Sequence, residues 1–329
     1  MKGRKNMAKK IGLVGIYFPG AYDALHENVP EGFELVDALS PETYGNLADC
    51  EYLISRLDID PDIINHTPNV KFWQRWGAGF DHVDLKAWGE RGIPIATCPG
   101  VNSGIVAELA IMLMLAGYRN LLQINRQLRA GHWPRTEYFG RSFMIKGKTV
   151  GVLGLGHIGK KVAALATAFG ANVIYYDIVR QTEQEEKFGY RFVDFDTLLR
   201  ESDIYTIHCP LNEETRGMIG AEQFAQMKPT AMLINTARGP IVDEAALIDA
   251  LTTGRIATAG LDTYKREPLP KDHPLLTLDN VVASAHAGGN TKDNDINMVN
   301  YVYHNIVAFD RGEPLNTPGD IVNGEYLKK

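Results

Sequence analysis

Polar side chains that could do chemistry follow three short apolar segments in the second half of the chain. Arg238 comes after AMLINTA, Glu267 lies a few residues after ATAGLD, and His286 follows VVASA. Each alone has an ordinary structural interpretation: a surface cation, a solvated loop acid, or a hydrogen-bonded core histidine. Ligands of parallel α/β sheets bind beyond the carboxyl ends of the strands. Gathered at such an edge, the three residues could serve as an anion clamp, an orienting acid and a proton donor.

A glycine motif upstream could bind a dinucleotide. Residues 150–177 read VGVLGLGHIGKKVAALATAFGANVIYYD, in which Gly154, Gly156 and Gly159 follow an apolar segment and open a helical pattern. The first glycine permits a tight turn, the second lets a pyrophosphate approach the backbone, and the third lets helix pack on strand. Asp177 would accept hydrogen bonds from the adenosine ribose and repel a 2′-phosphate, which favours NAD over NADP. Arg180, shortly after it, could weaken that preference.

The elements that must position these residues form two series. Apolar segments alternate with helical patterns from the start of the chain to IPIAT, and a second series of six expected strands begins at Lys148. Continuous apolar strands with crossovers indicate parallel sheets covered on both faces. A last helical pattern, residues 293–311, is expected to return to the first unit. The sequence therefore predicts an α/β fold with two doubly wound parallel sheets.

This pattern also predicts how the domains are connected. A Rossmann-like NAD-binding domain, residues 103–292, would be inserted into a flavodoxin-like substrate domain formed by residues 7–102 and 293–329. The insertion explains why the glycine motif begins so far into the chain. We expect a cleft between the two domains that closes on the substrate and excludes water.

Composition limits the classes of partner. The chain has 329 residues, a formal net charge of −6 and 45% hydrophobic residues, which is typical of a globular protein of two domains. An acidic balance gives no reason to expect nucleic acid or an anionic membrane surface as a partner. The three scattered cysteines predict neither a disulfide framework nor a zinc site. The longest apolar stretch, residues 109–117, is shorter than the ~18 residues that span a bilayer, so we expect a cytoplasmic protein.

A helical segment after Ser103 indicates an assembly. Residues 105–122 are apolar on nearly every side, and such a helix must be buried within its own chain or against another subunit. Twofold dimers are the commonest closed assembly. We therefore predict a homodimer.

Several ordered motifs together resemble the D-isomer-specific 2-hydroxyacid dehydrogenase family, almost from end to end. They are GAGFDHVD at 77–84, VNSGIVAE at 101–108, GLGHIGKKVA at 154–163, HCPLNEETRGMI at 208–219, MKPTAMLINTARGPIVDEAAL at 227–247, GLDTYKREPL at 260–269 and SAHAGGNT at 284–291. The resemblance implies an NAD-dependent enzyme that transfers hydride between the cofactor and a small 2-keto or D-2-hydroxy acid.

The resemblance also implies roles for individual residues. Arg238, Glu267 and His286 would be catalytic, with Arg238 on the substrate carboxylate, His286 exchanging the proton, and Glu267 holding the imidazole and favouring its protonated form. The backbone amides of Ala78 and Gly79 would bind the substrate carboxylate as well. Besides Gly154, Gly156 and Gly159, the implied cofactor contacts are His157, Ile158, Asp177, Pro210, Thr215, Thr236, Ala237, Arg238, Asp262, His286 and Gly288, with Asp262 on the nicotinamide carboxamide.

The sequence departs from the family pattern or narrows it at three positions. Ala285 stands where a proline usually precedes the histidine, which loosens the argument about the local backbone. Glu267 stands where the formate dehydrogenase branch has glutamine, which argues against formate. Arg75, two positions before Gly77, resembles the phosphoglycerate branch and is weak support for a phosphorylated substrate. A glyoxylate or hydroxypyruvate type and an NAD-sensing corepressor that keeps the same residues remain the alternatives.

Overall fold

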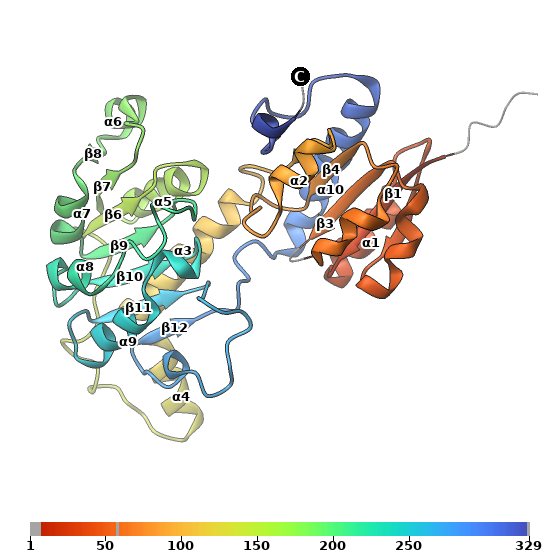
Figure 1. Ribbon diagram of the computed structural model, residues 1–329. Helices are drawn as coiled ribbons and strands as arrows, with labels where there is room; N and C mark the ends of the chain where they lie inside the picture. Colours follow the sequence, from red (N-terminus) through yellow and green to blue (C-terminus); the bar gives the residue numbers. More distant parts are fainter. Residues whose placement is uncertain (1–7, 57–58, 328–329) are drawn as a thin grey trace, which may run out of the picture. The chain divides into compact units, whose positions relative to one another are not determined.

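The computed structural model describes residues 8–56 and 59–327, and the chain divides into two compact units (Figure 1). Unit 1 comprises the residues up to Asn102 together with those from Asn290 onward, and unit 2 is Ser103–Gly289. Each unit is built on its own parallel sheet.

Unit 1 contains a five-stranded parallel sheet of order β2-β1-β3-β4-β5, the flavodoxin-like order. Its strands are β1 Lys9–Gly15, β2 Phe33–Ala38, β3 Tyr52–Arg56, β4 Phe72–Arg75 and β5 Ile95–Ala96. Its helices are α1 Pro19–Glu27, α2 Leu85–Glu90 and α10 Lys292–Arg311, with the 3-10 helices η1 Pro41–Asp49, η2 Pro61–His66 and η5 Gly324–Tyr326. The sequence reading missed β2, because this edge strand, FELVDA, is only partly buried and carries acidic residues.

Helices cover both faces of this sheet. In β3, Ile54 packs with residues of α1 and α10 on one face, whereas its neighbour Leu53 packs with residues of η1 and α2 on the other. Successive strand residues point to opposite faces. A strand buried on both sides therefore needs an unbroken apolar sequence, which is why the central strands were recognisable.

Unit 2 contains a seven-stranded sheet of order β12-β11-β10-β9-β6-β7-β8, in which the order reverses beside β6 as in a Rossmann fold. Its strands are β6 Thr149–Leu153, β7 Asn172–Tyr176, β8 Arg191–Phe192, β9 Ile204–Ile207, β10 Met232–Asn235, β11 Thr258–Leu261 and β12 Val281–Ala283. Its helices are α3 Ser103–Tyr118, α4 Leu121–Arg129, α5 His157–Ala168, α6 Thr182–Phe188, α7 Phe195–Glu201, α8 Ala221–Gln226 and α9 Glu244–Thr252, with η3 Gly239–Ile241 and η4 Pro274–Leu276.

The predicted fold class is confirmed, with one correction to the strand count. The sequence indicated six strands in unit 2 and the sheet has seven. The additional strand, β8, is only two residues long, too short to produce an apolar period of its own.

Helix α3 packs its small and branched residues against the sheet and α5. Not all of its apolar side chains are buried within the unit, because Met112 is 53% exposed. Among residues 8–56 and 59–327, no individual helix is both long and apolar enough to cross a membrane. Helices α3 and α4 have the necessary length and apolar composition only when they are taken together, and the chain bends by 63° between them.

Candidate active site

The three residues singled out from their positions after strands lie at neighbouring strand ends of unit 2. Arg238 follows β10, Glu267 follows β11, and His286 follows β12, and these strands are adjacent in the order β12-β11-β10. The strands are parallel, so their carboxyl ends meet at one edge. The geometry therefore brings together an arginine, a carboxylate and an imidazole.

Glu267 and His286 are hydrogen-bonded. The distance from His286 Nδ1 to Glu267 Oε2 is 2.6 Å, and Glu267 Oε1 accepts from the backbone amide of Tyr264 at 2.9 Å. Burial raises the pKa of Glu267, but the bonds from His286 and Tyr264 and the charges of His286 and Arg238 outweigh it and hold that pKa below its usual value. An ionised Glu267 thus orients the imidazole ring through Nδ1.

The loop that carries His286 is shaped by Asp262. His286 has a φ of 51°, in the left-handed region that non-glycine residues adopt only when the surroundings enforce it. Its amide donates to the Asp262 carbonyl at 2.8 Å, and the Asp262 carboxylate accepts from the amides of Ala287 at 2.9 Å and Gly288 at 3.0 Å. In a chain with Ala285 in place of proline, these bonds constrain the backbone.

Sequence reasoning missed two residues that join the strand ends. A Cβ atom on Gly239 would lie 1.9 Å from the carbonyl carbon of Tyr264, so only glycine lets the Arg238 loop approach the loop of Glu267. The Tyr264 hydroxyl donates to the Ser284 carbonyl at 2.7 Å and thereby links the β11 loop to the end of β12. Gly239 stands next to Arg238 and could have been noticed, whereas nothing local identifies Tyr264.

The glycine motif has the geometry that a dinucleotide requires. Gly154 has a φ of +88°, and a Cβ there would lie 2.7 Å from the Cys209 amide nitrogen. A Cβ on Gly159 would lie 2.1 Å from the Gly154 carbonyl oxygen, whereas one on Gly156 would meet nothing within 4 Å. The first and third glycines thus serve the turn and the helix packing, and the second faces open space where a pyrophosphate could approach the start of α5.

Asp177 lies against this glycine loop. Its Oδ2 accepts from the Leu155 amide at 2.6 Å and its Oδ1 from the Val179 amide at 3.0 Å. The carboxylate is therefore held at the end of β7 beside the turn, where a ribose would follow the pyrophosphate.

The other implied cofactor residues also lie at strand ends or helix starts of unit 2. His157 and Ile158 open α5, and the Thr215 hydroxyl donates to the Pro210 carbonyl at 2.7 Å and closes the loop after β9. Thr236 and Ala237 follow β10. Thr236 is 7% exposed, and its hydroxyl has no hydrogen-bond partner within the described structure. Because buried polar groups are normally hydrogen-bonded, this hydroxyl is available to bind a ligand.

The predicted substrate loop belongs to unit 1. Ala78 and Gly79 follow β4, and the loop is fastened by the Cys98 amide donating to the Gly77 carbonyl at 2.8 Å. Arg75, 7% exposed, donates to Ser55 Oγ at 3.2 Å and to the Gly79 carbonyl at 3.4 Å. Part of its role is therefore to hold this loop.

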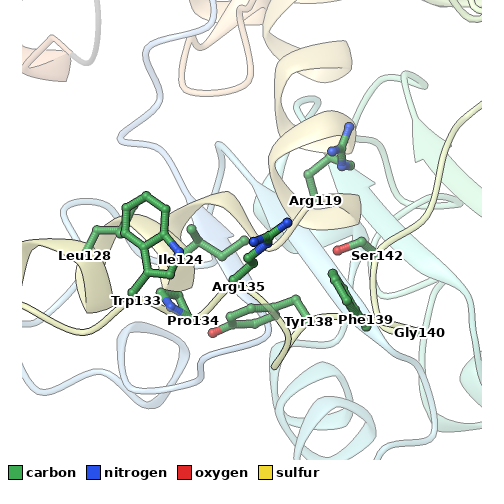
Figure 2. Close-up of a pocket in the computed structure, with 10 residues that line it drawn as sticks. All are labelled: Arg119, Ile124, Leu128, Trp133, Pro134, Arg135, Tyr138, Phe139, Gly140 and Ser142. Carbon is green, nitrogen blue, oxygen red and sulfur yellow. The ribbon is translucent and has the colours of Figure 1, made fainter.

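Unit 2 also contains a pocket of about 420 Å³ (Figure 2). It is formed by the end of α3, by α4 and by the following loop, with Ile124, Leu128 and Trp133 among its lining residues. None of its lining residues belongs to the predicted site. Trp133 is 76% exposed.

Known proteins resemble this chain over most of its length. The model of the family described as D-isomer specific 2-hydroxyacid dehydrogenase, NAD binding domain, matches residues 111–288, more than half of the chain. A glyoxylate reductase of Korarchaeum cryptofilum is 39% identical over 284 residues, which are 85% of this chain and 85% of that protein. A D-3-phosphoglycerate dehydrogenase of Archaeoglobus fulgidus is 41% identical over 261 residues, which are 79% of this chain and 49% of that protein.

A solved structure shows the same resemblance in three dimensions. The crystal structure of a glyoxylate reductase from Paecilomyes thermophila superposes with a TM-score of 0.81 at 31% identity and covers 95% of this chain and 98% of its own. The residues matched by the family model include the glycine motif, Arg238, Glu267 and His286. The chain therefore belongs to the D-isomer specific 2-hydroxyacid dehydrogenase family and is an NAD-dependent oxidoreductase of small 2-hydroxy and 2-keto acids.

Proposed function

We propose that His286 exchanges the proton in this reaction, Glu267 orients its ring, and Arg238 binds the substrate carboxylate. The observation that carries the proposal is the 2.6 Å contact between His286 Nδ1 and Glu267 Oε2 at the strand edge shared with Arg238. It places an ionised carboxylate against one nitrogen of the imidazole, which fixes the orientation of a ring that could give a proton to a carbonyl oxygen.

Bound NADH would supply the hydride. The protein's own part is to donate a proton from His286 Nε2 to the carbonyl oxygen of the 2-keto acid and, in the reverse direction, to remove it from the hydroxyl. The Arg238 guanidinium would bind the carboxylate and polarise the neighbouring carbonyl. The backbone amides of Ala78 and Gly79 would bind that carboxylate too.

A short substrate of the glyoxylate or hydroxypyruvate kind is the first candidate. The named relatives include glyoxylate reductases that match along most of their length, whereas the phosphoglycerate dehydrogenase matches over about half of its own. In addition, Arg75 donates hydrogen bonds to Ser55 and to the Gly79 carbonyl, so it has a structural role in the substrate loop. A steady-state screen over glyoxylate, hydroxypyruvate, pyruvate, phenylpyruvate and 2-ketoisocaproate tests the proposal, and preference for a bulky side chain would contradict it.

A phosphorylated substrate is the second candidate. Arg56 and Arg75 end the neighbouring strands β3 and β4 and are each 7% exposed. Burial lowers the pKa of Arg56 more than the charges of Tyr17 and Asp295 restore it, so a dianion there would stabilise the guanidinium. Including 3-phosphohydroxypyruvate in the same screen distinguishes the two, because the second candidate requires its kcat/KM to exceed that of hydroxypyruvate.

We further propose a cytoplasmic homodimer that prefers NAD to NADP. The free cysteines Cys50, Cys98 and Cys209 favour a reducing compartment. Apolar side chains exposed on α3, α4 and the following loop, including Met112, Leu121 and Trp133, favour a subunit contact. The NAD-sensor alternative predicts NADH binding without a fall in NADH fluorescence on addition of any 2-keto acid of the screen.

A further inference from the structure

Arg180 is the cation nearest in sequence to Asp177, and it is held by a bidentate ion pair. Its Nε donates to Glu185 Oε1 at 2.8 Å and its Nη2 to Glu185 Oε2 at 2.7 Å. This fork geometry is the one that arginine uses for phosphate. The guanidinium N–H groups of Arg180 that could bind a 2′-phosphate are thus already hydrogen-bonded to the Glu185 carboxylate.

Glu185 is fixed independently of Arg180. The hydroxyl of Tyr175, a fully buried residue of β7, donates to Glu185 Oε1 at 2.7 Å and accepts from the Gln181 amide at 2.8 Å. The Glu185 side chain is 17% exposed, whereas that of Arg180 is 59% exposed. The glutamate is therefore the anchored partner, and the arginine is the movable one.

The charges near this corner of the sheet discourage an additional anion. Hydrogen bonds from Arg180 and Tyr175 lower the pKa of Glu185 to about 2, so it is ionised at neutral pH. Asp177, which accepts from the Leu155 amide, is a second carboxylate and follows β7, the strand whose Tyr175 holds Glu185. A 2′-phosphate would face Asp177, while Arg180, the cation nearest to Asp177 in sequence, is paired with Glu185.

We propose that Glu185 is a specificity-determining residue that excludes NADP by holding Arg180 in a closed ion pair. Asp177 repels the 2′-phosphate, and Glu185 removes the cation that would compensate for the repulsion. The inference rests on the proposed position of the adenosine ribose at Asp177. It implies that Asp177 and Glu185 act together, so that replacing either alone restores only part of the affinity for a 2′-phosphate.

The test is calorimetric binding of 5′-AMP and adenosine 2′,5′-bisphosphate to the full chain, for wild type, Asp177→Ser, Glu185→Gln and the double variant. Glu185→Gln should raise affinity for the bisphosphate about tenfold while leaving that for 5′-AMP within about twofold, since a new charge-assisted bond is formed. The double variant should gain more than the product of the two single gains. Loss of affinity for both nucleotides in Glu185→Gln would mean a merely structural role and overturn the proposal.

Arg180→Met provides the matched control. Combined with Glu185→Gln, Arg180→Met should abolish the gain in affinity for the bisphosphate. Combined with Asp177→Ser, Arg180→Met should leave the affinity for the bisphosphate unchanged, because Arg180 is still paired with Glu185 in that variant. The proposal that Glu185 withholds Arg180 from the cofactor would be refuted if the gain of Glu185→Gln persisted after Arg180→Met was added. It would also be refuted if Arg180→Met in the presence of Glu185 lowered the affinity for the bisphosphate. This second measurement can be made even if Glu185→Gln fails to fold. If Asp177→Ser by itself does not change the preference between the two nucleotides, the assignment of the ribose to Asp177 is wrong instead.

Discussion

Replacing Glu267 with glutamine should shift the pH dependence of both reaction directions to lower pH. Glutamine keeps a hydrogen-bonding side chain of the same length but removes the charge beside the imidazole. Reduction needs the protonated ring, so its kcat/KM declines as pH rises through the titration of the pair. Oxidation needs the neutral ring, so its kcat/KM declines as pH falls. Without the carboxylate the protonated ring is less stable, and both limbs move in the same direction.

The size of the shift follows from the exposure of the pair. Unit charges about 4 Å apart interact by roughly 1 kcal/mol in water and roughly 4 kcal/mol at an effective dielectric constant of 20. The side chains of His286 and Glu267 are 46% and 34% exposed, so we take the aqueous limit, about 1 kcal/mol. Because about 1.36 kcal/mol corresponds to a tenfold change, Glu267→Gln should change kcat/KM at a fixed pH on the sloping part of either limb by roughly fivefold.

The assay is kcat/KM against pH for glyoxylate reduction and for oxidation of the matching 2-hydroxy acid. Glu222→Gln, an exposed glutamate at the start of α8, is the control for an equal change in net charge and should leave both profiles in place. Limbs of Glu267→Gln that coincide with those of wild type, or that move in opposite directions, would show that Glu267 does not tune the proton donor. The donor would then have to be another group.

Three further results are expected. His286→Ala should lower turnover about 10²- to 10⁴-fold, the range of general acid–base catalysis, while NADH titration shows unchanged binding; equal loss of binding would contradict its role. Gly159→Ala should lower the melting temperature, because its Cβ would lie 2.1 Å from a carbonyl oxygen and overpacking costs about 1–3 kcal/mol. Gly156→Ala should leave the melting temperature unchanged and weaken NAD binding. The reverse pattern would exclude the roles assigned to these two glycines. Sedimentation at micromolar concentration should give a dimer, and a mass near 36.5 kDa would rule out the proposed assembly.

Local patterns were sufficient for the central strands of both sheets and for the strand-end residues. Central strands buried on both faces need continuous apolar sequence, and the glycines of the motif are required by their own turn, so both could be recognised before the structure. The same reasoning placed Arg238 and His286 directly after strands and Glu267 a few residues downstream of one. Edge strands β2 and β8 were missed, because one is partly polar and the other has two residues.

What the sequence alone could not determine are the contacts between segments distant in the chain. Gly239 is needed because the backbone of Tyr264 approaches it, Asp262 shapes the histidine loop through the amides that follow β12, and Glu185 pairs with Arg180 because Tyr175 holds it there. Composition and periodicity report which face of an element is buried. Which atoms meet across two loops depends on the register and packing of the whole sheet, so only the tertiary structure decided how the predicted residues are oriented and restrained.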